Sequence, residues 1–485
     1  MMERYGVFID GCARPGRGET SVLVEPWSGE PFAEVTNGTT ADLDEAVIVA
    51  RRAFTSSGWQ VKAPLERARV MTRCADALMA HRDEVATLEA RNVGRPLRET
   101  QRNVELAADA FAYFASLTTH VRGATIPLGP GLFDYTLREP FGVCGLITPW
   151  NNPVVLASWK IAAGLAAGNA LVVKPASNTP LSVLVIAELL TEAGLPPGQL
   201  NVVPGPGAEL GDRLVEHPWV AKVSFTGSTE TGIRVIERSA GHLAKVSLEL
   251  GGKSPSLVFG DADLELALDG SVPAMFANAG QMCTARSRVL VEAERAEEFI
   301  EGFVNRVSHL RMGSPFEPEV SLGPLISRGQ QERVLGFVER AAASGATVRC
   351  GGGQPVHPDL INGFFVEPTV ITDAGEEAEI MREEVFGPVV VIERFHSEAE
   401  AITRANESRY GLAATLWTSD LGRAHRVAAA LQVGTVTVNT TKVSHVYAPF
   451  GGYKASGLGR ELGLEGLDEF LQVKNVIVAV DRRPV

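Results

Sequence analysis

This chain of 485 residues contains only five cysteines, and none of them forms a Cys-x-x-Cys pair. Their odd number and wide spacing indicate neither a disulfide framework nor a zinc site, so we expect reduced thiols, as in the cytoplasm. Acidic residues outnumber basic ones: the chain has 58 aspartates and glutamates but 45 lysines and arginines, which gives a formal net charge of -13. Nucleic acid phosphates require a basic surface. We therefore expect no metal and no nucleic-acid partner.

Long uninterrupted apolar runs are lacking as well. The most apolar stretch, residues 153–173, is long enough to cross a bilayer, but Lys160 lies near its middle and Gly168 interrupts it. The first residues, MMERYGVFIDG, carry charges and no apolar core, so no signal peptide is visible. We interpret the stretch as a buried helix followed by a buried strand, and we expect no membrane partner and a cytoplasmic location.

Apolar residues make up 45% of the chain, which is enough to build two or more domains. In its middle, short Val/Leu/Ile runs alternate with helical patterns, which is typical of a parallel sheet covered on both faces. Such a sheet binds ligands beyond the carboxyl ends of its strands. Strands are expected at 143–148, 170–174, 200–203, 222–225 and 246–250, with helices at 154–167, 181–193, 208–216 and 230–239.

A second α/β pattern follows from about residue 252. Residues 132–139 and 471–480 belong obviously to neither pattern and look like strands with exposed apolar edges. They could pair with each other, pair with another subunit, or form ordinary edge strands. In the second pattern, strands are expected at 256–259, 288–292, 389–392, 413–417 and 435–439, with helices at 294–310, 330–343, 398–406 and 421–431.

Two residues offer a nucleophile and a base on turns rich in small residues. Cys283 lies in GQMCTARSR, and Glu249 lies in LELGGKSP at the end of a predicted strand. A thiol reacts as its thiolate, so its use depends on local pKa and access. The local sequence alone favours the other interpretation, that Cys283 is a small buried hydrophobic residue, which is the commonest fate of a free cysteine.

Three other strand ends carry polar groups. Asn151, in TPWNNP, could donate to an oxyanion or simply form a turn. Lys174, in KPASNTP, could bind ribose or phosphate or lie at the surface. In FTGSTETG, Ser228 can cap a helix whose N-terminus favours a phosphate, although the Gly spacing is not that of the usual dinucleotide fingerprint.

Seven segments, in this order and spacing, resemble the aldehyde dehydrogenase superfamily: TPWNNP, KPASNTP, FTGSTETG, LELGGKSP, GQMCTARSR, EEVFGPV and PFGGYKASGLGRE. The resemblance covers essentially the whole chain and favours Cys283 as a nucleophile. It implies an α/β fold with a Rossmann-like parallel-sheet cofactor domain, a second α/β catalytic domain and a small β oligomerisation arm. The cofactor domain is expected at 1–122 and 141–251, the catalytic domain at 252–455, and the arm at 123–140 and 456–485.

The resemblance implies a non-phosphorylating, NAD(P)-dependent oxidation of an aldehyde to a carboxylic acid. Cys283 would form a thiohemiacetal whose oxyanion is held by Asn151 and by the backbone N–H of Cys283. Hydride transfer to the nicotinamide would leave a thioester, and Glu249 would act as the general base in its hydrolysis. Lys160 and Glu461 match family positions near the proton path and are expected to relay protons.

The same resemblance identifies cofactor-binding residues. Glu384 matches the carboxylate that binds the nicotinamide ribose, and Phe386 matches the ring beside it. Many NAD-preferring relatives carry Glu where this chain has Ser177, which is small and neutral, so we expect that NADP is tolerated or even preferred to NAD. The full expected set is Ile147, Thr148, Pro149, Trp150, Lys174, Ala176, Ser177, Gly207, Phe225, Gly227, Ser228, Gly232, Leu250, Glu384 and Phe386.

The substrate pocket departs from many relatives by being more polar. Asn152 and Ser444 stand where relatives often carry aromatic residues, and Lys442, His445 and Tyr447 lie near Ser444 in the sequence. Polar groups select substrates through hydrogen bonds that would otherwise go unpaired, so a polar or semialdehyde-type substrate is expected. The expected pocket residues are Asn152, Leu156, Trp159, Met282, Thr284, Ser444 and Phe450.

Three other functions compete with this interpretation. A cysteine hydrolase would need a histidine, and only His445 lies near a segment of interest. A CoA-acylating semialdehyde dehydrogenase would generally lack the general-base carboxylate, so Glu249 disfavours it. A non-catalytic structural or binding protein on the same scaffold, as in lens proteins, would not need Cys283. For the favoured function we expect a small-molecule aldehyde as substrate and a homodimer or homotetramer.

Overall fold

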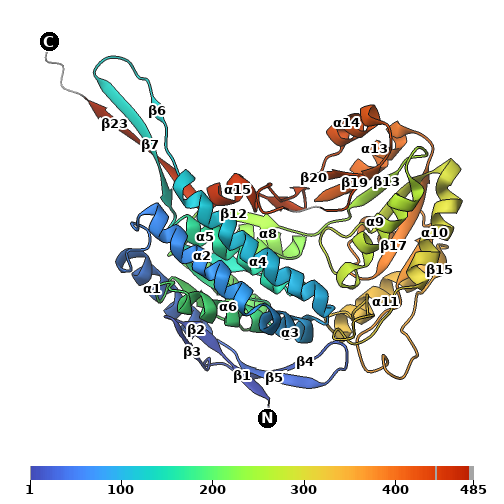
Figure 1. The fold of residues 1–485 in the computed structure, drawn as a ribbon, viewed down its shortest axis with the longest axis horizontal. Helices are drawn as coiled ribbons and strands as arrows, with labels where there is room; N and C mark the ends of the chain where they lie inside the picture. Colours follow the sequence, from blue (N-terminus) through green and yellow to red (C-terminus); the bar gives the residue numbers. More distant parts are fainter. Residues whose placement is uncertain (1, 443–444, 480–485) are drawn as a thin grey trace.

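The computed structural model describes residues 2–442 and 445–479, and it confirms the α/β fold class. Figure 1 shows two sheet-and-helix units side by side, with a narrow β arm extending away from the first. The domain boundaries stay a prediction. Among the described residues, no helix is long and apolar enough to cross a membrane.

The first unit is built on an eight-stranded sheet in the order β22-β12-β11-β8-β9-β10-β2-β3, and its five middle strands are parallel. Chain order reverses between β8 and β11, which makes the gap beyond their carboxyl ends the expected ligand crevice. The strands are β2 (Val7–Ile9), β3 (Cys12–Arg14), β8 (Val143–Ile147), β9 (Ala170–Lys174), β10 (Leu200–Val202), β11 (Val220–Thr226), β12 (Lys245–Glu249) and β22 (Gly457–Leu458).

Helices cover both faces of this sheet. One face packs against α2 to α6 and the other against α1, α7 and α8. Ser228 caps α8 by accepting from the backbone N–H of Thr231 at 3.2 Å, as its position before a helical pattern predicts. The helices are α1 (Thr40–Ser56), α2 (Pro64–Ala80), α3 (Arg82–Val93), α4 (Leu97–Leu117), η1 (Thr118–His120), α5 (Pro153–Ala166), α6 (Leu181–Glu192), α7 (Gly207–Glu216), α8 (Thr229–Ser239) and α15 (Gly463–Asp468).

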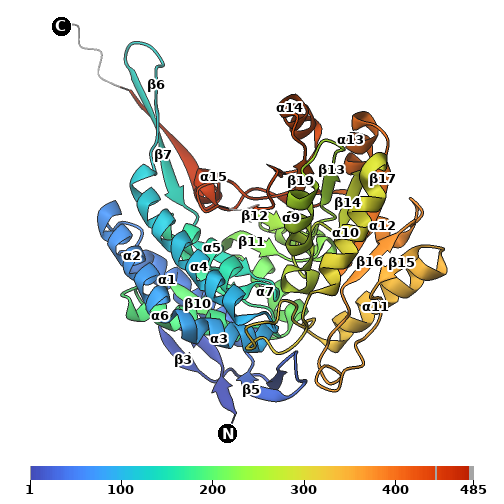
Figure 2. The ribbon, with the colours of Figure 1, turned by 45° about the vertical axis from the view of Figure 1, so that its right-hand side comes forward.

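The second unit, brought forward in Figure 2, holds a seven-stranded sheet in the order β15-β16-β17-β14-β13-β19-β20, parallel except at β15. Apolar clusters with α9 to α12 and with α13 and α14 bury its two faces. Its strands are β13 (Pro255–Val258), β14 (Arg288–Glu292), β15 (Thr347–Cys350), β16 (Thr369–Thr372), β17 (Val389–Phe395), β19 (Ala413–Trp417) and β20 (Thr435–Val438). Its helices are α9 (Leu264–Phe276), η2 (Ala277–Gly280), η3 (Ala293–Arg295), α10 (Ala296–Ser308), α11 (Arg328–Ala343), α12 (Glu379–Arg382), α13 (Glu398–Asn406) and α14 (Leu421–Ala430).

The two unassigned apolar segments of the sequence pair with each other. β7 (Leu132–Pro140) and β23 (Leu471–Ala479) run antiparallel over nine residue pairs, and β6 (Thr125–Ile126) adds a short third strand. These strands form the projecting arm of Figure 1. Two small sheets complete the fold: β1 (Glu3–Tyr5), β5 (Pro31–Thr36) and β4 (Thr20–Val24), and β18 (Tyr410–Gly411) with β21 (Tyr453–Lys454).

Candidate active site

Residues from both units line one cavity of about 290 Å³. The first unit contributes the chain that follows β8, β11 and β12, which are the strand ends at the switch point. The second unit contributes Cys283 and residues around α11, α12 and β18. The lining residues are Pro149, Trp150, Asn151, Leu156, Thr226, Gly227, Ser228, Thr229, Glu230, Leu250, Gly251, Cys283, Gln330, Arg333, Glu383, Glu384, Phe386 and Tyr410.

Cys283 follows an unusual turn at the end of α9. Asn278, Ala279 and Gly280 have φ of 50°, 53° and 72°, a left-handed run that Asn and Gly tolerate best. A Cβ on Gly280 would lie 2.2 Å from the backbone oxygen of Gly387, so only glycine fits there. The Gln281 side chain braces the turn, since its Oε1 accepts from the backbone N–H of Ile326 at 2.9 Å.

Both the side chain and the backbone of Asn151 form hydrogen bonds with the turn before Cys283. Its Nδ2 donates to the backbone oxygen of Gln281 at 2.8 Å, and its own backbone oxygen accepts from Asn278 Nδ2 at 2.8 Å. The side chain is buried. Because an amide nitrogen carries two hydrogens, the second N–H of Asn151 is left for a ligand beside Cys283.

The thiol of Cys283 lies in a partly buried setting near carboxylates. Burial, followed by the negative charges of Glu384, Glu249 and Glu461, raises its pKa to about 12. At neutral pH the group is therefore a thiol, and its attack on a carbonyl requires a proton acceptor or a nearby positive charge.

Glu249 ends β12 and lies behind the cavity wall, with only 5% of its surface exposed. Burial, and then the negative charge of Glu461, raises the pKa of its carboxyl well above the usual value. Its Oε2 finds no hydrogen-bond partner among the described residues. The turn that follows is fixed by Ser456, whose backbone oxygen accepts from Leu250 N at 2.9 Å and whose Oγ donates to Gly251 O at 2.7 Å.

A buried ion pair lies close to Glu249. Lys160 on α5 pairs with Glu461 and donates to Ser224 Oγ at 3.1 Å. Both charged residues are at most 8% exposed, so each depends on the other to offset the cost of its burial. Neither residue lines the cavity. The negative charge of Glu461 raises the pKa of Glu249, and the positive charge of Lys160 lowers it.

The groove beside Cys283 suits a dinucleotide. Gly227 and Ser228, at the start of α8, line the cavity, and a helix N-terminus favours a phosphate. Gly232 lets the helix pack closely, because a Cβ there would lie 2.6 Å from the Leu250 side chain. Glu384 Oε1 accepts from the backbone N–H of Gly252 at 2.9 Å, and burial raises the pKa of its carboxyl to about 7. Trp150 and Phe386 meet edge to face at 5.2 Å between ring centroids.

A second group of predicted cofactor residues lies farther along the same sheet edge, at the ends of β8, β9 and β10. Burial lowers the pKa of the Lys174 ammonium to about 8, and its Nζ is 3.9 Å from where a Cβ on Gly207 would stand. Ser177 is exposed and donates from Oγ to the backbone oxygen of Gly205 at 2.7 Å. Four further members of the predicted set do not line the 290 Å³ cavity: Ile147, Thr148 and Ala176, and Phe225 on β11.

Among the predicted substrate residues, Asn152, Met282 and Thr284 are next to Asn151 or Cys283 in the sequence, and Leu156, Trp159 and Phe450 belong to the buried apolar cluster against which Cys283 packs. Trp159 and Phe450 are buried and meet edge to face at 5.6 Å. Asn152 Oδ1 accepts from Arg95 Nη1 at 3.3 Å, a contact that no local sequence signal indicated. Ser444 lies outside the described residues. Of the predicted set only Leu156 lines the cavity, while Met282 and Thr284 flank the thiol and are half-buried.

Several lining residues escaped the sequence analysis. Gln330, Arg333 and Tyr410 come from α11 and β18, which carry no recognisable motif. Glu383 directly follows α12 and is the first residue of EEVFGPV, but the sequence analysis assigned it no role. The Asn-Ala-Gly turn did carry a signal, because Asn and Gly favour positive φ. None of the described residues that line the cavity is a histidine, which disfavours the cysteine-hydrolase interpretation.

Comparisons with known proteins find one family over nearly the whole chain. The model of the Aldehyde dehydrogenase family matches residues 14–476. A betaine aldehyde dehydrogenase of Cereibacter sphaeroides is 45% identical over 98% of this chain and 97% of its own length, and one of Bacillus subtilis is 42% identical over 97% and 96%.

Solved structures are similar over the whole chain. The NAD+ complex of a Staphylococcus aureus betaine aldehyde dehydrogenase matches with a TM-score of 0.97 at 39% identity, covering 99% of this chain and 96% of that one. The NAD+ complex of a Bacillus cereus aldehyde dehydrogenase matches with a TM-score of 0.96 at 42% identity, covering 99% and 97%.

The pKa of Cys283 leads to a prediction for its alkylation. At pH values below the pKa of about 12, the thiolate fraction of Cys283 grows about tenfold per pH unit. Alkylation by iodoacetamide should therefore accelerate without a plateau from roughly pH 6 to 10. Peptide mapping by mass spectrometry measures the rate at Cys283, with the exposed Cys12 as an internal control. A plateau for Cys283 near pH 8 would contradict the raised pKa.

Proposed function

Because this chain belongs to the aldehyde dehydrogenase family, we propose that it oxidises an aldehyde to the carboxylic acid, with NAD or NADP as hydride acceptor. The observation that carries the proposal is that Asn151 and Cys283 line one cavity together with Ser228, Glu384 and Phe386. A nucleophile, an oxyanion donor and a dinucleotide groove therefore meet at one place, as the reaction requires.

In the proposed reaction, the Cys283 thiol loses its proton to solvent, Sγ bonds to the aldehyde carbon, and the former carbonyl oxygen becomes an oxyanion. The second N–H of Asn151 Nδ2 and the backbone N–H of Cys283 donate to that oxygen. Removing one such donor has cost about 3–4 kcal/mol in other enzymes. When bound, the nicotinamide ring supplies the acceptor for the hydride, and the carbon left on Cys283 is a thioester.

Glu249 then accepts a proton from the water that attacks the thioester, the carbon–sulfur bond breaks to release the acid, and the Cys283 thiolate regains a proton from solvent. A carboxylate with a raised pKa is a stronger base than an exposed one, so burial favours this role. The proton would pass from Glu249 toward the Lys160–Glu461 pair behind it. A CoA-acylating relative would not need such a base, so the buried Glu249 supports hydrolysis.

The dinucleotide would lie along the carboxyl ends of the first sheet. Ser228 and the start of α8 would hold the pyrophosphate, Lys174 and Ser177 the adenosine ribose, and Glu384 the nicotinamide ribose. Ser177 presents no negative charge to a 2′-phosphate, which supports use of NADP as well as NAD.

The chemistry around Cys283 supports a polar aldehyde as substrate. Three of the four related proteins above are named for betaine aldehyde, whose quaternary ammonium would be recognised by the faces of several aromatic rings. Here Trp159 and Phe450 pack against each other, while positions 152 and 444 carry Asn and Ser. A substrate with oxygen atoms or a carboxylate fits these groups better than a bare alkyl chain.

Free thiols at all five cysteines fit a reducing compartment, so we propose that the protein works in the cytoplasm.

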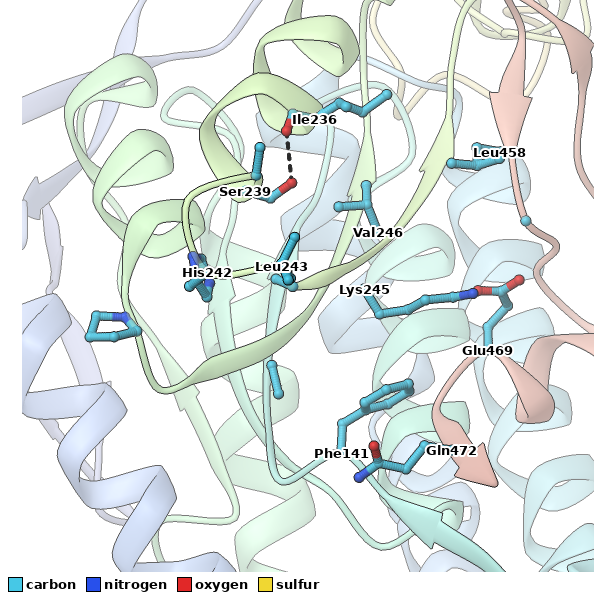
Figure 3. Close-up of a pocket in the computed structure, with 15 residues that line it drawn as sticks. Phe141, Ile236, Ser239, His242, Leu243, Lys245, Val246, Leu458, Glu469 and Gln472 are labelled. Carbon is cyan, nitrogen blue, oxygen red and sulfur yellow. Dashed lines mark hydrogen bonds between the residues drawn. The ribbon is translucent and has the colours of Figure 1, made fainter. Parts of the chain in front are cut away.

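We also propose that the protein is a homodimer or homotetramer. The arm exposes apolar side chains on both strands, with Phe133 at 49%, Val473 at 59% and Ile477 at 57%. A hollow of about 810 Å³ lies away from the catalytic residues, between the end of α8, the start of β12 and the C-terminal segment (Figure 3). Ile236 and Leu243 border it, and Leu243 is 88% exposed. Exposed apolar surface of this extent is typical of an interface.

Replacing the general base should separate the two halves of the reaction. Glu249→Gln should keep a rapid burst of NADH, about one per site, but lower steady turnover by about 10²- to 10⁴-fold. Because the base must be ionised, wild-type turnover should rise with pH through the raised pKa of Glu249, and the variant should lose that rise. Stopped-flow absorbance measures both phases, with the exposed Glu319→Gln as control. Normal steady turnover in Glu249→Gln would remove Glu249 from this role.

A panel of aldehydes assayed with both cofactors tests the substrate and cofactor proposals. Oxygenated and carboxylated aldehydes should give higher kcat/KM than alkanals of equal length, and NADP should support turnover.

Ser177→Glu should lower kcat/KM for NADP by at least about tenfold and leave that for NAD nearly unchanged, because it sets a carboxylate against the 2′-phosphate. A clear preference for alkanals or betaine aldehyde, or strict selectivity for NAD, would defeat the corresponding proposal.

The oligomer is tested by light scattering after size exclusion. The wild type should have two or four times the chain mass, and Ile236→Asp with Leu243→Asp should shift it toward smaller species, since each places a charge in the interface. Leu421→Asp, at a residue 72% exposed on α14 of the other unit, is the matched control. A wild-type monomer at micromolar concentration would contradict the proposal.

A further inference from the structure

An arginine outside the predicted site bridges the two units at the cavity. Arg409, just before β18, donates from Nη2 to Glu383 Oε2 at 2.9 Å and to the hydroxyl of Tyr410 at 2.8 Å. The same nitrogen lies 3.5 Å from Glu230 Oε1. Glu230, Glu383 and Tyr410 all line the cavity, so the arginine joins three of its wall residues.

These contacts span the interface between the units. Glu230 lies in the first turn of α8, in the first unit, and Glu383 directly follows α12, in the second. A hydrogen bond of the Glu230 carboxylate to its own backbone N–H is the main cause that lowers its pKa, which keeps it charged opposite Arg409. The arginine thus holds two carboxylates that would otherwise repel each other.

The backbone of Arg409 is fixed to the first turn of α8. Its oxygen accepts from the backbone N–H of Ala455 at 3.1 Å, and the oxygen of Ala455 accepts from Thr229 Oγ1 at 3.1 Å. The next residues form β18, which pairs with β21. The backbone of Arg409 is therefore fixed, and its guanidinium can hold the segment that carries Glu383.

That segment also carries the carboxylate expected to bind the nicotinamide ribose. Glu384 is the next residue, its Oε1 accepts from Gly252 N at 2.9 Å, and its backbone oxygen accepts from Arg333 Nη2 at 3.3 Å. Holding Glu383 fixes the chain on one side of Glu384. Losing that tie would let the 383–384 segment move away from Gly252 and open the cavity.

We propose that Arg409 is a positioning residue, which ties Glu383 to the first turn of α8 and thereby slows the release of the dinucleotide from the cavity. This inference rests on the proposed function, since it takes the cavity to be the cofactor site. Arg409 and Glu383 are each about two-fifths exposed, so each pair is weak alone and is screened by salt. The expected effect is accordingly modest, about three- to tenfold in the dissociation rate.

The experiment is stopped-flow displacement of bound NADH by excess NAD, followed by the loss of NADH fluorescence, on the whole protein. Arg409→Met should release NADH about three- to tenfold faster, Arg409→Lys should fall between it and the wild type, and Glu383→Gln should resemble Arg409→Met. The double variant should add little to either single change, because both remove one interaction. Higher salt should speed release from the wild type more than from Arg409→Met. The control is Arg426→Met, which breaks ion pairs to Glu398 inside the second unit.

The readouts separate positioning from a general structural role. Arg409→Met should raise KM for the cofactor while the NADH burst keeps its amplitude, and its thermal midpoint should move no more than that of Arg426→Met. Unchanged release in Arg409→Met and in Glu383→Gln, with NADH bound by the wild type, would overturn this inference alone. A wild type that binds no NADH would overturn the proposed function as well. Faster release in Arg426→Met equal to that in Arg409→Met would also overturn the inference.

Discussion

The hydrogen bond from Asn151 Nδ2 to the backbone oxygen of Gln281 joins the two α/β units where the proposed reaction takes place. One partner follows the strand beside the switch point of the first sheet, and the other belongs to the left-handed turn before Cys283. Together with the bond from Asn278 Nδ2 to the backbone oxygen of Asn151, this hydrogen bond holds the amide and the thiol at the same small cavity.

Buried charge is the second constraint on the site. Cys283, Glu249 and Glu384 all have raised pKa values, and burial is the largest cause for each. The same burial that makes the thiol harder to ionise makes Glu249 a stronger base. Burial therefore disfavours the reactive thiolate of Cys283 and strengthens Glu249 as a base.

Local sequence predicted much of the fold because the decisive signals were local. The continuous Ala-Leu-Val-Val-Lys run predicted β9 at its observed bounds, since a central parallel strand is buried on both faces. The helix 421–431 ends one residue earlier than predicted, which is within the normal spread of helix ends. The helices before residue 118 and strand β15 were not assigned, because their patterns mix apolar and charged residues. Strand β16 was missed because Thr-Val-Ile-Thr is only four residues long.

By itself, the sequence determined which residue types stand at the strand ends and, through its resemblance to a family, which reaction they suit. Apolar runs, capping residues and glycine positions act over a few residues, so they can be recognised in one chain. Tertiary structure alone decided that Asn151 and Cys283 share a cavity, that Glu249 lies behind its wall, and that Arg409 reaches Glu383 and Glu230. Those contacts depend on how two sheets pack, and no local pattern encodes that packing.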